Sequence, residues 1–209
     1  MKKIIFTGLI LLSSAYLSAQ IKAVTETGDE LFLYQDGTWE YANDNQVDGM
    51  KIPVSEQEYM KNESSTFLVK SKVLDVGIWI NPKTWSFSKG TGEEAFEFQF
   101  QKKQGDLYAM LIAEKIEIPV ETLRGIALDN AKAVAPDIKI TNEEYRTVNG
   151  IQVLMLQMEG TIQGMKVKYH GYYYSNSSGT IQLLTYTGLN LYDEYLETIN
   201  LFLNGFVVL

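Results

Sequence analysis

The sequence MKVKYHGYYYSNSSGTIQLLTYT, residues 165–187, decides the fold because it predicts a long β-hairpin followed directly by a helix. It carries the only histidine of the chain, His170, and five of the thirteen tyrosines. Side chains alternate between the two faces of a strand, so His170 shares one face with lysines and tyrosines. The following helix is predicted over Leu191–Leu203, with Asn190 as its N-cap and Gly205 just past its end.

The segments before this hairpin extend the same pattern. Strands predicted over Ile138–Val148 and Ile151–Glu159 are joined by Asn149-Gly150, which favours the positive φ values of a type I′ turn. A helix bracketed by two prolines is predicted over Val120–Val134. Its core-facing stripe is expected to be Val120, Leu123, Ala127, Ala131 and Val134. Earlier strands are predicted at Phe67–Leu74, Gly77–Asn81, Ala95–Phe100 and Leu107–Ala113.

The order of these elements predicts the fold class of residues 67–209. Strands come first, then a helix, four consecutive strands and a last helix. This order favours an α+β domain, in which an antiparallel sheet carries two main helices, over alternating βαβ units.

The residues before this domain divide into three predicted parts. Residues 1–19 have a basic start, an apolar core and a small-residue end at Ala19, which is typical of a secretory signal peptide. The apolar core is shorter than the roughly 20 residues that span a bilayer, so no transmembrane segment is expected after cleavage. Residues 20–42 predict a three-stranded β-meander with a turn at Asp36-Gly37, and residues 43–66 predict an acidic linker. We therefore expect an exported protein, periplasmic or extracellular.

Composition excludes several classes of protein. The chain has no cysteine, so disulfides and thiolate metal sites are excluded. Residues 20–66 hold three lysines against ten acidic residues, and residues 67–209 hold thirteen basic against sixteen acidic residues. Because no face-sized basic cluster occurs, we expect no nucleic-acid partner.

His170 is the obvious candidate for a general base or a metal ligand. It shares a strand face with Lys166 and Lys168, whose charges would lower its pKa rather than build a metal site. One histidine cannot form a histidine cluster, and the motifs HExxH, GxSxG, GxxxxGK[ST] and GxGxxG are all absent. We therefore expect no catalytic residue, no metal site and no cofactor.

Acidic residues offer two weaker possibilities. A carboxylate pair for glycoside hydrolysis would come from Glu93, Glu94 and Glu97 or from Glu114 and Glu117. Nothing in the sequence marks two of these carboxylates as convergent, and charged residues at strand ends are ordinarily solvated.

A partial calcium-loop pattern occurs in the acidic segment. Residues 44–56 follow the first, fifth and sixth positions of an EF-hand loop. The third position is Gln46 and the twelfth is Ser55, which do not fit the pattern, and helical flanks are missing. We interpret this segment as part of the acidic linker.

The aromatic residues suggest binding rather than catalysis. Trp79, Trp85, Tyr172, Tyr174 and Tyr186 could form a stacking surface for a glycan or a protein, or they could complete the core. The binding face that we predict from the hairpin comprises Lys166, Lys168, His170, Tyr172, Tyr174 and Tyr186.

Residues 67–209 resemble the PsbP-like α+β fold. The resemblance rests on VGIWINPKTW (76–85), the helix after Ile118-Pro119, the hairpin at 164–188 and DEYLETINLFLNGF (193–206). The segment KAVTETGDELFLYQDGTWEYA (22–42) is similar to a short DGTW-type β-meander found in exported bacterial proteins. The fold is shared by the extrinsic photosystem II subunit, a Ran-binding nucleotide-release factor and bacterial periplasmic proteins. The resemblance implies a protein that binds and assists, with no catalytic residues to carry over.

Together these features predict a non-catalytic exported binding or assembly module at the cell envelope, with another envelope protein as its partner. The alternative is a small-molecule or glycan binder that uses exposed aromatic residues. A second alternative is a hydrolase based on carboxylate pairs, with or without His170.

Overall fold

The computed structural model of the chain describes residues 21–24, 30–34, 39–41, 52–92 and 94–209. The chain divides into two compact units, and the second unit begins at Ile52. In the first unit, β1 (Ile21–Val24), β2 (Glu30–Leu33) and β3 (Trp39–Tyr41) pair antiparallel in the order β1-β2-β3. The predicted signal peptide and residues 43–51 of the predicted linker lie outside the described residues.

The second unit is built on a sheet of eight strands in the order β4-β10-β11-β12-β13-β9-β8-β7. Neighbouring strands run antiparallel except β4 and β10, which run parallel. The strands are β4 (Val54–Tyr59), β7 (Trp85–Lys89), β8 (Phe98–Lys102), β9 (Leu107–Glu114), β10 (Lys139–Val148), β11 (Ile151–Ile162), β12 (Met165–Asn176) and β13 (Gly179–Gly188).

A smaller sheet and two helices complete the unit. The smaller sheet has the order β14-β6-β5 and comprises β5 (Phe67–Lys70), β6 (Val76–Ile80) and β14 (Phe206–Val208). The two α-helices are α1 (Val120–Val134) and α2 (Tyr192–Leu203), and the short 3-10 helix η1 (Leu189–Leu191) precedes α2. The predicted class, an antiparallel sheet with two main helices packed on it, is confirmed.

The long central strands follow from local turn chemistry. Asn149 and Gly150 have φ values of 49° and 80°, as the type I′ turn between β10 and β11 requires. Gln163 and Gly164 repeat this geometry between β11 and β12, with φ values of 49° and 82°. Because each connection is tight, four strands that are consecutive in the sequence are also neighbours in the sheet.

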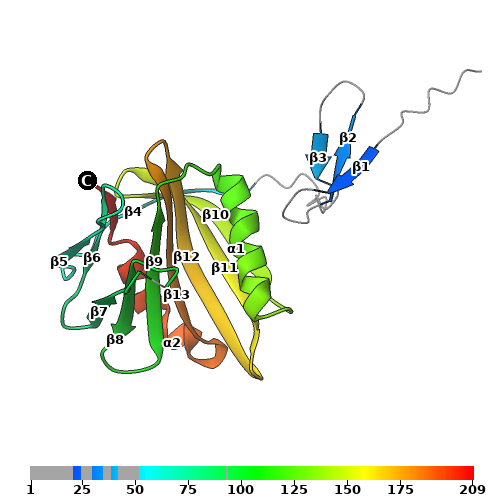
Figure 1. The fold of residues 1–209 in the computed structure, drawn as a ribbon. Helices are drawn as coiled ribbons and strands as arrows, with labels where there is room; N and C mark the ends of the chain where they lie inside the picture. Colours follow the sequence, from blue (N-terminus) through cyan, green and yellow to red (C-terminus); the bar gives the residue numbers. More distant parts are fainter. Residues whose placement is uncertain (1–20, 25–29, 35–38, 42–51, 93) are drawn as a thin grey trace, which may run out of the picture. The chain divides into compact units, whose positions relative to one another are not determined.

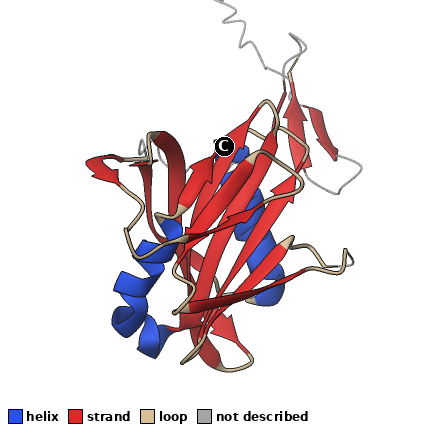
Figure 2. Cartoon of the chain, turned by 90° about the vertical axis from the view of Figure 1, so that its left-hand side faces the viewer, coloured by secondary structure: helices blue, strands red, loops and turns tan. Residues whose placement is uncertain are grey.

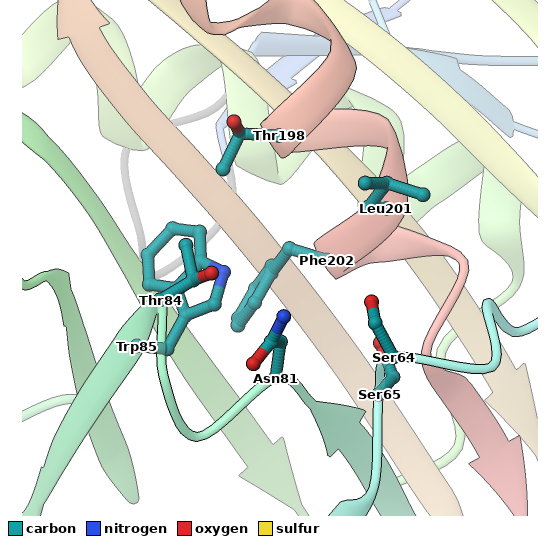
Figure 3. Close-up of a pocket in the computed structure, with 8 residues that line it drawn as sticks. All are labelled: Ser64, Ser65, Asn81, Thr84, Trp85, Thr198, Leu201 and Phe202. Carbon is teal, nitrogen blue, oxygen red and sulfur yellow. The ribbon is translucent and has the colours of Figure 1, made fainter.

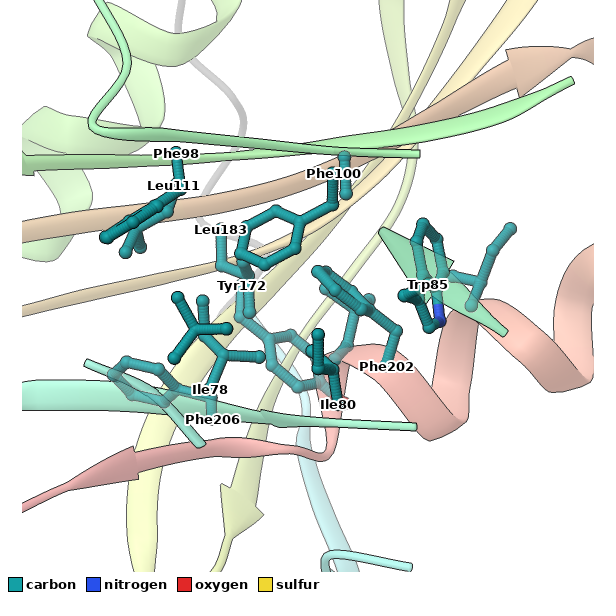
Figure 4. Close-up of a cluster of buried hydrophobic side chains, with 14 of the residues drawn as sticks. Ile78, Ile80, Trp85, Phe98, Phe100, Leu111, Tyr172, Leu183, Phe202 and Phe206 are labelled. Carbon is teal, nitrogen blue, oxygen red and sulfur yellow. The ribbon is translucent and has the colours of Figure 1, made fainter. Parts of the chain in front are cut away.

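The two helices lie on opposite faces of the large sheet (Figures 1 and 2). On one face, Leu123 and Ala127 of α1 pack against Leu154, Leu156 and Tyr173 of β11 and β12. On the other face, α2 and the small sheet enclose the main core. Figure 4 shows part of this core, where Phe202 of α2 and residues of β6 and β14 meet side chains of the large sheet.

The start of the second unit differs from the prediction. Residues 54–59, assigned to the acidic linker, form β4 and pair with Tyr145, Thr147 and Val148 of β10. Its backbone completes the open edge of β10, and Tyr59 packs against the main core. The polar sequence of this segment is explained by its edge position, since most of its side chains are exposed.

Helix α2 also begins differently from the prediction. The 3-10 helix η1 precedes it, so Leu191 rather than Asn190 occupies the N-cap position, and no side chain caps the helix. Asp193 and Glu194 in its first turn face the positive end of the helix dipole instead.

Smaller differences concern strand ends and one apolar stripe. The predicted strand 67–74 ends at Lys70, and residues 85–89, which the prediction left outside a strand, form the edge strand β7. In α1, the predicted stripe ends at Ala131, because Val134 is 60% exposed.

Candidate functional site

The predicted binding face on β12 is largely buried beneath α2. His170 and Tyr172 are each 1% exposed, so they belong to the core and not to a surface. Lys168 and Tyr174 are half-buried, and Lys166 is exposed. The structure therefore places the lone histidine away from solvent.

The chemistry around His170 is that of a buried neutral imidazole. The hydroxyl of Tyr192 lies 3.0 Å from its Nδ1, while Nε2 is buried without a hydrogen-bond partner among the described residues. Burial, assisted by the positive charges of Arg146 and Lys168, lowers the pKa of His170 to about 3. At neutral pH the imidazole is uncharged, and its burial keeps it out of contact with any substrate.

Lys168 is held by partners of its own. Its Nζ donates to Oε1 of Glu159 at 2.7 Å and lies 4.4 Å from the ring centroid of Tyr192. Tyr192 thus contacts both His170 and Lys168.

A second polar group lies beside Tyr172 on the same face of the sheet. The Tyr172 hydroxyl donates to Oδ1 of Asn204 at 2.8 Å and accepts from Arg146 at 3.3 Å. Arg146 also pairs with Glu144 at 2.7 Å, and its guanidinium lies 4.5 Å from the ring centroid of Tyr59. These contacts join β4, β10, β12 and the end of α2, so they are architectural.

The remaining aromatic candidates on this side are also packed. Trp85 is 4% exposed, and its ring lies 4.4 Å from that of Phe202. Trp79 is half-buried beneath Lys61, and the Tyr174 ring lies 5.7 Å from that of Phe206.

Two of the candidate carboxylates, Glu94 and Glu97, are held by hydrogen bonds to different segments. Glu93 lies outside the described residues, and Glu94 accepts hydrogen bonds from the backbone and hydroxyl of Thr91, both at 2.7 Å. Glu97 accepts from Ser71 at 2.5 Å and from the backbone of Lys72 at 2.6 Å. In the part of the chain that the structure describes, no three histidine, aspartate or glutamate residues are grouped to hold a metal ion.

The calcium-loop pattern falls mainly on residues 44–51, outside the described residues. Its twelfth position, Ser55, and the following Glu56 lie in strand β4.

A pocket between α2 and the loop before β7 is small. It has a volume of about 60 Å³ and is lined by Ser64, Ser65, Asn81, Thr84, Trp85, Thr198, Leu201 and Phe202 (Figure 3). Its size is suited to ordered water rather than to an organic ligand, since typical ligand sites have volumes of roughly 300–1,000 Å³.

Tyr186 lies on the opposite face of the large sheet from His170. The register of β12 and β13 pairs Tyr186 with Tyr169, and the register of β13 and β9 pairs it with Tyr108. The rings of Tyr108 and Tyr186 stack with centroids 5.5 Å apart and planes at 20°, and those of Tyr169 and Tyr186 lie 5.9 Å apart. We call Tyr108, Tyr186 and Tyr169 the tyrosine row.

Burial raises the pKa of Tyr169 and that of Tyr186, with a hydrogen bond from Gln99 opposing the shift at Tyr186. Their hydroxyls therefore remain neutral hydrogen-bonding groups at physiological pH.

An open groove lies at one end of the tyrosine row. It has a volume of about 240 Å³ and is lined by Ser86, Phe87, Ser88, Gln99, Phe100, Gln101 and Tyr108. Ser86, Ser88 and Gln101 are exposed, whereas on the same face α1 packs over β11 and β12. The groove and the tyrosine row together form the candidate binding site.

Only Tyr186 of the predicted residues belongs to this site. The alternation FEFQFQ at 96–101 places Gln99 and Gln101 on a shared strand face, which is a local signal for these two lining residues of the groove. Tyr108 and Tyr186 meet through the pairing of β9 with β13, two strands far apart in the sequence, and no local pattern predicts this contact.

No helix within the described residues is long and apolar enough to span a membrane. No family model matches the sequence, and no curated protein matches it.

Three solved structures are similar to this chain. Cyanobacterial PsbP from Synechocystis superposes with a TM-score of 0.53 and 13% identity, covering 71% of this chain and 95% of that one. LpqN of Mycobacterium tuberculosis, described as involved in cell envelope biogenesis, gives 0.48 and 12%, covering 68% and 88%. PA94 of Pseudomonas aeruginosa, described as a putative regulator, gives 0.40 and 9%, covering 64% and 92%.

The second unit therefore has a PsbP-like α+β fold, as the resemblance of residues 67–209 implied. At this level of identity the likeness establishes the fold and not a function.

Proposed function

We propose that the chain is a non-catalytic exported module that binds at the cell envelope. The observation that carries this proposal is the candidate binding site itself. It presents stacked aromatic rings, amides and hydroxyls on an open sheet face, and its lining contains no acid, base or nucleophile pair.

The state of the titratable groups supports a non-catalytic role. Acid–base catalysis at neutral pH needs a group whose pKa lies near the working pH and whose proton can reach the substrate. His170 fails both conditions because it is buried and its pKa is lowered to about 3. Of the carboxylates, Glu144 and Glu159 are held in ion pairs.

The signal peptide that the sequence predicts at residues 1–19 supports export, and an exported chain would meet its partner outside the cytoplasm. The absence of cysteine in the sequence is consistent with a domain whose stability comes from its packed core alone.

A sedimentation experiment tests this proposal. The full chain is mixed with an envelope fraction from the cells that produce it, and the protein that co-sediments is measured. We expect saturable binding that falls about fivefold or more when Gln101→Glu places a charge in the groove. The matched control is Gln57→Glu, because Gln57 is exposed on β4, at the opposite edge of the sheet.

Binding of the control at the wild-type level, together with loss in Gln101→Glu, would support the proposal. Absence of saturable binding by the wild-type chain would contradict it, as would equal binding by both variants.

A further inference from the structure

We propose that the open groove and the tyrosine row bind a neutral oligosaccharide. This inference rests on the proposed binding function and names its ligand class. In our assignment one sugar ring occupies the groove beside Tyr108, and the saccharide continues across the strands over Tyr186 toward Tyr169.

The absence of charge in the groove lining favours a neutral ligand. The seven lining residues are two serines, two glutamines, two phenylalanines and a tyrosine. The nearest lysine on β8, Lys102, is engaged elsewhere: its Nζ donates to the carbonyl of Gln104 and lies 5.2 Å from the ring centroid of Tyr195. A phosphate or a carboxylate would find no cation among the lining residues to offset its loss of hydration.

The polar groups of the groove match the hydrogen-bonding capacity of sugar hydroxyls. A sugar hydroxyl both donates and accepts a hydrogen bond, and so do the serine hydroxyl and the glutamine amide. Strand pairing places Ser86 opposite Gln101 and Ser88 opposite Gln99, so two hydroxyl–amide pairs lie side by side. Ser86, Ser88 and Gln101 are exposed and can exchange water for ligand hydroxyls.

The tyrosine row supplies the complementary apolar surface. The C–H groups on one face of a pyranose carry partial positive charge, and the face of an aromatic ring is negative. Tyr108 lines the groove, and the row crosses β9, β13 and β12, a span of about 10 Å at the usual strand spacing. A linear saccharide lying across the strands would therefore contact more than one ring.

The size of the groove agrees with a single sugar ring rather than with a deeply enclosed ligand. Its volume of about 240 Å³ is below that of typical enclosed sites, roughly 300–1,000 Å³. A ligand there must gain affinity by extending along the surface, which the tyrosine row permits.

Titration calorimetry with the full chain and three neutral hexasaccharides tests the inference: maltohexaose, cellohexaose and hexa-N-acetylchitohexaose. We expect at least one to bind, and we expect Tyr108→Ala to weaken that binding about tenfold or more. Tyr108→Phe retains the ring and should stay within about twofold of wild type, if stacking supplies the affinity. Gln101→Ala, at an exposed position, should weaken binding without disturbing the fold, and Gln57→Ala on β4 should leave it unchanged.

The outcomes separate the two proposals. If no hexasaccharide binds but envelope sedimentation still depends on Gln101, the saccharide is the wrong ligand and the binding function stands. If neither binding is seen, both proposals are wrong. Saccharide binding that survives both Tyr108→Ala and Gln101→Ala overturns the assignment of the site.

Discussion

Replacing His170 with phenylalanine is expected to make the protein markedly more acid-resistant. Between pH 7 and pH 4 the unfolding free energy of the variant, measured relative to that of the wild type, should rise by about 3 kcal/mol. At pH 7 itself the two proteins should differ by only about 1–2 kcal/mol, because the variant loses one hydrogen bond to Tyr192 but also removes the unpaired Nε2.

The direction of this effect follows from proton binding. Burial first, then the charges of Arg146 and Lys168, lowers the folded-state pKa of His170 from 6.5 to about 3. Below pH 6.5 the histidine binds a proton in the unfolded chain but not in the folded one. The unfolding free energy of the wild type therefore falls by about 1.4 kcal/mol per pH unit. The stabilisation by the neutral ring is complete above pH 6.5 and is lost as the pH falls toward 3. The phenylalanine side chain has no group that binds a proton, so the variant does not show this loss.

Urea denaturation at half-unit pH steps measures the effect. Other groups titrate in the same range, so the informative quantity is the difference between the two curves. Thr185→Val provides the control: Thr185 is fully buried and donates to the carbonyl of His170 at 2.7 Å, but it does not titrate. Its curve should run parallel to the wild-type curve, and a parallel His170→Phe curve would contradict the prediction.

Gly205→Ala should lower the unfolding free energy by about 3 kcal/mol or more. Gly205 is buried between α2 and β14, and its carbonyl accepts a hydrogen bond from the backbone of Trp79 at 2.8 Å. A Cβ at this position would overlap the carbonyl oxygen of Trp79 and lie 3.0 Å from that of Phe202. Both obstacles are backbone atoms, so they cannot move aside without shifting β6 or α2.

The same substitution at Gly125 should have the opposite sign. Gly125 lies within α1, and a Cβ there would meet nothing within 4 Å. Alanine should therefore stabilise the protein by about 0.5–1 kcal/mol through its better helix propensity. Thermal unfolding of both variants tests the two predictions. Similar melting temperatures for Gly205→Ala and wild type would contradict the close contact between Gly205 and the Trp79 carbonyl.

Gly205 also shows what can be predicted from the sequence and what cannot. The sequence places Gly205 just after a helix, where glycine usually supplies a left-handed residue. Gly205 is not among the residues of positive φ, and its missing side chain serves the close approach of β6. The sequence predicted a glycine after α2 correctly but for the wrong reason. The residue that requires it, Trp79 of β6, is brought close only by the tertiary structure.

Local patterns were sufficient for most of the elements and for the fold class, but not for the edge strands β4 and β7. Period-two alternation and Asn149-Gly150 determine the β10–β11 hairpin, and the apolar spacing in residues 120–134 determines α1 within its exact bounds. These signals depend on neighbours in sequence, where backbone sterics and side-chain direction act directly. The PsbP-like resemblance followed from the order of such elements.

By itself, then, the sequence determined the α+β class, the helices, the long hairpins and the absence of thiol chemistry. Only the tertiary structure decided which helix covers each face of β12, because both faces carry aromatic residues and alternation cannot distinguish them. The face bearing His170 is covered by α2, and that choice turns a candidate acid–base residue into part of the core. Tyr186 and Tyr108 become neighbours through the pairing of β13 with β9, because strand pairing is set by the packing of distant segments.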